Sequence, residues 1–163
     1  MPTPQAVAAT VADPELPMLT LADLGVLRNV EMSPDGTVIV SITPTYSGCP
    51  AMDAMKVDLT RKLQQAGYDR VEVRTVLSPP WSTDDITPAG RRALADHGIA
   101  PPGPAPRDDA PVLVALHPRP RQVDCPQCGS PDTVLVSQFS STACRALRRC
   151  TVCSEPFEHI KEL

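Results

Sequence analysis

The chain has 163 residues, which allows one domain of ordinary size and a small second one. Hydrophobic residues make up 42% and aromatic residues 3%, so a core can form but must be built mainly from aliphatic side chains. The formal net charge is -4 and no dense basic cluster is present, which argues against nucleic acid as the partner. Residues 1–10 lack the features of a secretory signal, and no stretch approaches the roughly 20 apolar residues that span a bilayer. We therefore expect a cytoplasmic protein without a membrane partner.

Turn and cap residues divide the first 99 residues into alternating helices and strands. Thr3-Pro4 is typical of a helix start, and Ser33-Pro34-Asp35-Gly36 is typical of a turn between two strands. This order predicts an α+β domain with a three-stranded or slightly larger sheet packed by helices. The expected elements are a helix at 3–11, a helical turn at 20–24, strands at 26–32 and 37–43, a helix at 52–66, a strand at 70–77 and a helix at 87–98.

Proline marks the boundary between this domain and the rest of the chain. Residues 100–106 contain four prolines and one glycine, a composition that favours neither helix nor sheet. A short apolar run, Val112 to Leu116, follows. We therefore divide the chain into a domain at 1–99, a Pro-rich linker at 100–120 and a cysteine-rich module at 121–163.

The cysteine-rich module contains two Cys-x-x-Cys pairs, Cys125/Cys128 and Cys150/Cys153, separated by residues 129–149. Each pair turns the backbone so that two thiolates converge, and a β-hairpin between the pairs brings the four together. Four thiolates in a closed tetrahedron suit structural Zn²⁺. Strands at Thr133–Phe139 and Ala146–Arg149 are expected for that hairpin. The sequence thus predicts a Cys₄ zinc site that stabilises a segment too small for a core of its own.

Other interpretations of the six cysteines stay open at this stage. Disulfides are disfavoured in a reducing compartment, and iron in a rubredoxin-like Cys₄ site would make an electron-transfer protein. Cys144 lies outside the two pairs. It is either a small buried hydrophobe or an additional thiol beside Arg145, Arg148 and Arg149.

The first domain contains a single cysteine, Cys49, between a predicted strand and a predicted helix. Pro50 suits the first position of a helix, which would place Cys49 at the helix N-terminus, where a thiolate is favoured. Cys49 could then act as a nucleophile or a soft-metal ligand, or simply pack in the core. A Cys–His hydrolase is disfavoured, because all three histidines come after the third predicted strand. Asp13 and Glu15 either cap helix ends in solvent or belong to the same functional region.

Several motifs together resemble a known family. These are Asp-Pro-Glu-Leu-Pro (13–17), Leu24-Gly25-Val26-Leu27, Thr45-Tyr46-Ser47-Gly48-Cys49-Pro50 and Pro79-Pro80-Trp81. They resemble the SufT-like family of small iron–sulfur assembly domains. With the Cys₄ tail, Ser-Thr-Ala-Cys (141–144) and Cys-Ser-Glu-Pro-Phe (153–157), the whole chain resembles the PaaD family of phenylacetate degradation.

The resemblance implies an accessory or maturation factor for the iron–sulfur or iron centres of the multicomponent phenylacetyl-CoA epoxidase. We therefore expect a non-catalytic accessory protein or complex subunit and not a free-standing enzyme. Cys49 would hold iron or an iron–sulfur cluster transiently, with Asp13 and Glu15 nearby, and a homodimer could share such a cluster. The expected partners are the epoxidase components, first the iron–sulfur reductase and then the diiron oxygenase. The alternatives are a zinc-containing adaptor that holds these components together and an electron-transfer protein.

Overall fold

The computed structural model describes residues 1–105 and 121–162. The chain divides into two compact units, Met1–Ala93 and Leu94–Leu163. The expected apolar run Val112 to Leu116 and most of the expected linker lie outside the described residues. Ala100, the first residue of that linker, belongs instead to a strand of the second unit.

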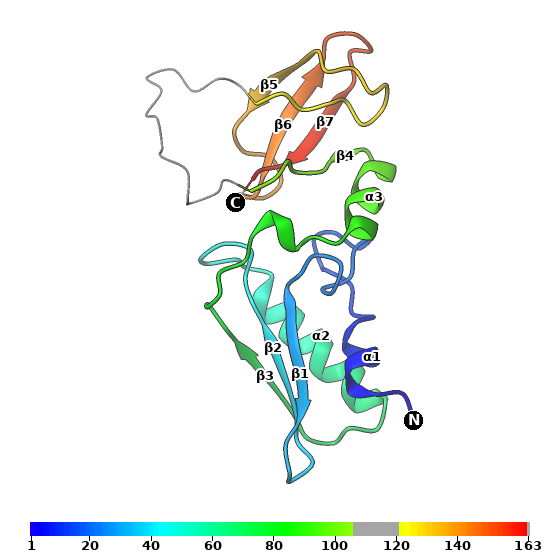
Figure 1. Ribbon diagram of the computed structural model, residues 1–163, viewed down its shortest axis with the longest axis vertical. Coiled ribbons are helices and arrows are strands. Elements are labelled where there is room, and N and C mark those ends of the chain that lie inside the picture. Colours follow the sequence, from blue (N-terminus) through cyan, green and yellow to red (C-terminus); the bar gives the residue numbers. More distant parts are fainter. Residues whose placement is uncertain (106–120, 163) are drawn as a thin grey trace. The chain divides into compact units, whose positions relative to one another are not determined.

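The first unit is an α+β structure in which helices pack against a three-stranded sheet (Figure 1). Every helix and strand expected in residues 1–99 is present, although helix α1 ends at Ala8 rather than near Val11. The elements are α1 (Pro4–Ala8), β1 (Leu27–Met32), β2 (Val38–Ile42), α2 (Met52–Gln65), β3 (Val71–Thr75) and a short 3₁₀ helix η1 (Thr83–Asp85), followed by α3 (Pro88–Asp96), which spans the boundary of the units in the sequence.

The order of the strands in this sheet is β1-β2-β3. Strands β1 and β2 form the predicted antiparallel hairpin, whose turn contains Gly36 at a φ of +83°. Strand β3 lies parallel to β2, with Val38 opposite Val71 and Ile42 opposite Thr75. Helix α2 connects these two parallel strands, as a crossover between parallel strands requires.

One face of the sheet and one face of α2 make the core of this unit. Strand β2 alternates fully buried Val38, Val40 and Ile42 with partly exposed residues. Met55, Leu59 and Leu63 recur on α2 at spacings of four residues, so they share one face of the helix, and all three are buried. Burial of each such side chain stabilises the fold by about 1.5–3 kcal/mol. This core supports the loops at both ends of β2.

The second unit contains a four-stranded sheet in the order β4-β7-β6-β5. Strands β5 (Thr133–Ser137) and β6 (Arg145–Cys150) form the predicted hairpin of the zinc ribbon. Strand β7 (Pro156–Ile160) adds to it antiparallel, and β4 (Ile99–Ala100) pairs parallel with β7. These two additional strands were not predicted, because β7 contains charged Glu158 and polar His159 and β4 has only two residues.

No helix in the part of the chain that the structure describes is long and apolar enough to cross a membrane.

Candidate metal centre and the Cys49 loop

The four cysteines of the two pairs converge in the second unit. Their sulfur atoms all lie within 4.8 Å of one another, with 3.7 Å between Cys125 and Cys153 and 3.6 Å between Cys128 and Cys150. A tetrahedron with metal–sulfur bonds of about 2.3 Å has edges of about 3.8 Å, close to these separations. The four thiols therefore fit a tetrahedral Zn²⁺ site, and zinc bound there would act as a structural cross-link.

The two Cys-x-x-Cys turns have equivalent backbone geometry. In each turn the first cysteine donates its N–H to the carbonyl five residues later, from Cys125 to Ser130 at 2.9 Å and from Cys150 to Glu155 at 3.0 Å. The residue after the second cysteine has a positive φ in both, +72° at Gly129 and +66° at Ser154. This repeated turn places two sulfurs of each pair on the same side of the backbone.

The crowding of the four sulfurs favours a bound cation, because without one it opposes the loss of all four protons. Hydrogen bonds from the backbone N–H groups of Cys153 and then Val152 help to lower the pKa of Cys150 to about 7. The backbone at Glu155 lowers the pKa of Cys153, but burial and the neighbouring sulfurs outweigh it and raise that pKa to about 12. Four thiolates at these distances repel one another unless a cation lies among them.

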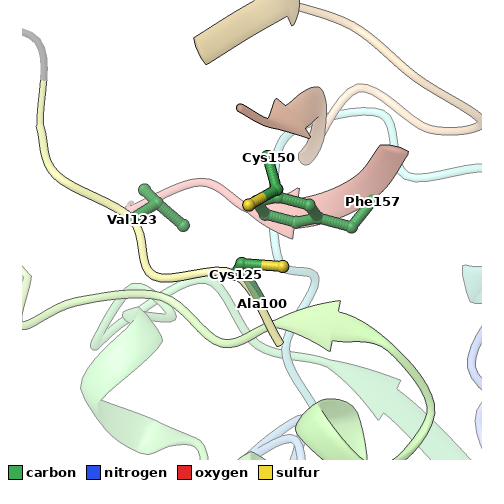
Figure 2. Packing of buried hydrophobic residues seen from close by; sticks show 5 residues of the cluster. All are labelled: Ala100, Val123, Cys125, Cys150 and Phe157. Atoms are coloured by element: carbon green, nitrogen blue, oxygen red, sulfur yellow. The ribbon is translucent and has the colours of Figure 1, made fainter. Parts of the chain in front are cut away.

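Two of the ligand cysteines are also core residues. Cys125 and Cys150 are buried with Ala100, Val123 and Phe157 in a cluster that Figure 2 shows. The other two ligand cysteines, Cys128 and Cys153, are exposed. Because the apolar part of this cluster is so small, the metal site is an integral part of the core of the sheet.

Glu158 holds the loop that contains the Ser-Thr-Ala-Cys motif. One of its carboxylate oxygens accepts hydrogen bonds from the hydroxyls of Ser140 (2.5 Å) and Ser141 (2.8 Å), and the other pairs with Arg145 at 2.8 Å. Burial raises the pKa of Glu158, but these hydrogen bonds outweigh it and lower the pKa to about 2. Sequence reasoning missed Glu158, because its partners come from a distant loop.

Cys144 lies in that loop and is not one of the four ligands. Its sulfur is half-buried and lies 3.1 Å from the hydroxyl oxygen of Thr142, and its carbonyl accepts a hydrogen bond from the backbone N–H of Lys161. Arg145, the nearest cation in sequence, is engaged by Glu158 and Ser141. A role for Cys144 as an additional thiol stays a prediction.

Cys49 lies before helix α2 rather than at its first turn. The helix begins at Met52 with Ala51 as its N-cap, so the expectation that Pro50 is the first helical residue was wrong. Cys49 donates its N–H to the Tyr46 carbonyl at 3.3 Å, and its own carbonyl accepts a hydrogen bond from the N–H of Met52 at 3.4 Å. These bonds close turns ahead of the helix, with Gly48 at a φ of +82°. The loop therefore holds the half-buried Cys49 near, but not on, the helix terminus.

A cavity of about 180 Å³ adjoins this loop in the first unit. It is lined by residues 43–47 together with Leu77, Pro80 and Trp81. Trp81 is buried, and its indole N–H donates to the Leu24 carbonyl at 2.7 Å. The cavity thus lies beside the residues that immediately precede Cys49.

Asp13 is buried, which contradicts the interpretation that it stays solvated. One of its oxygens accepts hydrogen bonds from the backbone N–H groups of Glu15 (2.8 Å) and Leu16 (2.7 Å), so it fixes the loop after α1. Glu15 is half-buried in the same loop. Among the described residues, Asp13, Glu15 and Cys49 do not form a group that could hold a metal, whereas the four cysteines do. The proximity of the two carboxylates to Cys49 stays a prediction.

Comparisons with known proteins agree with this two-part construction. A family model described as iron–sulfur cluster assembly protein matches residues 5–75, and one described as PaaD zinc beta ribbon domain matches residues 109–161. A crystal structure of a domain of unknown function from Bacillus anthracis matches with a TM-score of 0.52 and 27% identity, covering 56% of this chain and 87% of that one.

Two curated relatives extend these matches. A Staphylococcus aureus protein named Fe-S protein maturation auxiliary factor SufT is 31% identical over 52% of this chain and 96% of its own length. An Escherichia coli (strain K12) protein, provisionally named as one of the subunits of 1,2-phenylacetyl-CoA epoxidase, is 42% identical over 96% of this chain and 89% of its own length. These names are those of auxiliary factors and of a complex subunit, in agreement with an accessory role.

The fold and the site define an iron–sulfur assembly domain joined to a Cys₄ zinc ribbon. The match over nearly the whole chain then settles the family. The protein belongs to the PaaD family, which includes that epoxidase subunit.

Proposed function

We propose that this protein matures an iron–sulfur or iron centre of a multicomponent phenylacetyl-CoA epoxidase. The observation that carries the proposal is the presence of both modules in one chain that is similar to an epoxidase subunit over 96% of its length. The first candidate client is the iron–sulfur reductase component, and the second is the diiron oxygenase component. The cargo is iron or an iron–sulfur cluster.

The two modules take different roles in this proposal. Zinc at Cys125, Cys128, Cys150 and Cys153 is structural, because four protein ligands leave no open coordination position. Cys49 holds the cargo transiently, because one thiolate per chain binds it more weakly than a closed site does. A cluster shared by two copies of Cys49 would make the carrier a transient homodimer.

A specific observation supports a second candidate, an adaptor that holds the epoxidase components together. The second unit exposes several large apolar side chains, among them Val136 and Phe139, which is typical of an interaction surface. In the adaptor, Cys49 is only a packing residue.

The third alternative is an electron-transfer protein with iron in the Cys₄ site. Such a protein would be coloured and would bleach on reduction.

Client activation by a cysteine variant separates the carrier from the adaptor. The apo form of each epoxidase component is incubated anaerobically with an iron and sulfide source and with wild-type protein, Cys49→Ser or Cys144→Ser. We expect Cys144→Ser to activate the client like the wild type and Cys49→Ser to fail. Full activation by Cys49→Ser would defeat the carrier and favour the adaptor.

A further inference from the structure

Exposed apolar side chains gather on one strand of the second unit. In the first unit they are scattered over the N-terminus, β1, α2 and a loop, as Met1, Met32, Val57 and Leu77. In the second unit those in the described residues all lie on β5 or at its two ends. We call this set the β5 patch, and it consists of Val134, Leu135, Val136, Phe139 and Val152.

The β5 patch follows an edge strand of the sheet. Strand β5 is the last strand in the order β4-β7-β6-β5, and Val134, Leu135 and Val136 are exposed in succession, so both sides of this strand are apolar. A register shift between Leu135 and Ser137 places a bulge at Val136. At the start of β5 the N–H of Thr151 donates to the Asp132 carbonyl at 2.9 Å, which holds neighbouring Val152 beside the strand. At the other end the N–H of Phe139 donates to the Ser137 hydroxyl at 3.2 Å.

The edge strands of the first unit have a different character. The outward residues of β3 include Glu72 and Arg74, which form an exposed ion pair at 2.7 Å, and β1 carries exposed Asn29 and Glu31. Charged side chains of this kind protect a sheet edge from unwanted contacts. Strand β5 carries no charged residue, and three of its five residues are exposed apolar side chains, which is typical of an interaction surface.

Two cations flank the β5 patch. Arg149 is exposed and lies opposite Val134 in the strand register, and the ammonium of Lys161 lies 4.5 Å from the centre of the Phe139 ring. Neither is within ion-pair distance of a carboxylate in the described part of the chain, whereas Arg145 is paired with Glu158. A partner surface that combines apolar side chains with carboxylates would complement both the apolar β5 patch and these two cations.

A second copy of this chain is a less suitable partner for the β5 patch than an apolar and acidic surface of another protein. Pairing of β5 with another β5 needs a regular ladder of backbone hydrogen bonds, and the bulge at Val136 interrupts that ladder. Side-chain contact with a separate apolar and acidic surface needs no such ladder. Strand β5 is only about 17 Å long, and a contact surface of this size favours the weak and reversible binding that a carrier needs.

We infer that the β5 patch is the surface on which this protein docks its client, through an apolar face of the client that bears carboxylates. This inference rests on the proposed function, because the client is an epoxidase component. It assigns docking to the zinc ribbon and leaves cargo handling to the first unit. The zinc site contributes indirectly, because Thr151 and Val152 lie between two of its ligands.

Binding measurements on surface variants test this inference. The zinc-loaded full chain is titrated with the purified reductase and oxygenase components from the same organism. The variants are Val136→Glu, Phe139→Ser and Arg149→Glu, each checked for one zinc per chain and an unchanged melting temperature. Val57→Glu is the matched control, because Val57 is 65% exposed on α2 and Val136 is 57% exposed.

We expect Val136→Glu and Arg149→Glu to weaken binding about tenfold or more, because each sets a negative charge against an acidic partner. Phe139→Ser should also weaken it, whereas Val57→Glu should bind like the wild type. The salt dependence should become shallower in Arg149→Glu. Wild-type affinity in all three patch variants would overturn the inference, as would binding of neither component or a self-association that the patch variants abolish.

Cys49→Ser separates this inference from the proposed function. Normal binding by Cys49→Ser with loss of client activation supports both. If the patch variants bind normally and Cys49→Ser still fails to activate the client, docking through the β5 patch is contradicted and the carrier role of Cys49 is supported. If the patch variants lose binding and Cys49→Ser activates the client, the docking surface stands and the carrier is wrong.

Discussion

Ser154 and Gly129 occupy equivalent positions in the two metal-binding turns, but only one of them is glycine. Both have a positive φ, which costs an ordinary L-residue about 1 kcal/mol and costs glycine nothing. A Cβ at Gly129 would meet no atom within 4 Å, so the space for a side chain exists and only the backbone conformation matters. The two positions therefore form a matched pair.

Exchange of these residues should change the stability in opposite directions. We expect Ser154→Gly to stabilise the zinc-loaded protein, and Gly129→Ser to destabilise it, each by about 1 kcal/mol. The measurement is the urea midpoint of the β5–β7 sheet, followed by amide signals in NMR spectra. Equal effects of the same sign would show that the two turns are not equivalent.

Glu158 gives a second prediction at the scale of single residues. Its folded pKa of about 2 lies below the unfolded value of about 4.3, so its stabilising effect is present above pH 4.3 and is lost as the pH falls through 2. Glu158→Gln should therefore lower the free energy of unfolding by about 2 kcal/mol, equally at about pH 6 and pH 8. Glu155→Gln, at an exposed site, is the control. A loss no greater than in this control would contradict the role of Glu158.

The elements of the first unit depend on the packing of α2 against β2. Leu59 is fully buried at the centre of the helix, whereas Val57 is 65% exposed. Leu59→Ala should destabilise this unit by about 3 kcal/mol through the cavity it leaves, and Val57→Ala by less than about 0.5 kcal/mol. Urea denaturation followed by the fluorescence of Trp81, the only tryptophan, reports on this unit. Similar midpoints for both variants would contradict the packing described here.

We expect the strands of the second unit to depend on a metal held by the four cysteines. Cys125 and Cys150 make up two of the five residues in its small apolar cluster, so loss of the metal removes both a cross-link and part of the core. A strong chelator should abolish the hydrogen-exchange protection of β5, β6 and β7 and leave Trp81 fluorescence unchanged. Retained protection of β6 after complete zinc removal would show that the metal is dispensable for this sheet.

The sequence was most informative where a local pattern had a local cause. The β1–β2 hairpin and helix α2 were predicted, because a turn, an alternation or a four-residue spacing specifies each of them. The short strand β4 was missed, because a two-residue strand has no pattern of its own and is formed by pairing with β7. Strand β7 was missed because charged Glu158 interrupts its apolar residues, and the partners of Glu158, Ser140 and Arg145, lie 13 or more residues away.

The candidate sites differed in the same way. The spacing of the four cysteines specifies a metal site, and the structure brings their sulfurs together. The start of helix α2 was placed two residues too early, at Pro50 instead of Met52, because Pro50 suits a helix start but the backbone groups of Cys49 close a preceding turn. The burial of Asp13 and the network around Glu158 depend on tertiary contacts, which no single stretch of sequence contains.

In the proposed function, the whole molecule combines a closed structural metal site with a cargo-handling cysteine elsewhere in the chain, and metal analysis tests that division most directly. Wild-type protein, Cys49→Ser and Cys144→Ser are purified anaerobically as full chains, and their zinc, iron and sulfide are measured. We predict one zinc per chain in all three, with additional iron and sulfide in the wild type and Cys144→Ser but not in Cys49→Ser. Equal iron and sulfide in Cys49→Ser, or zinc alone in all three proteins, would contradict the carrier.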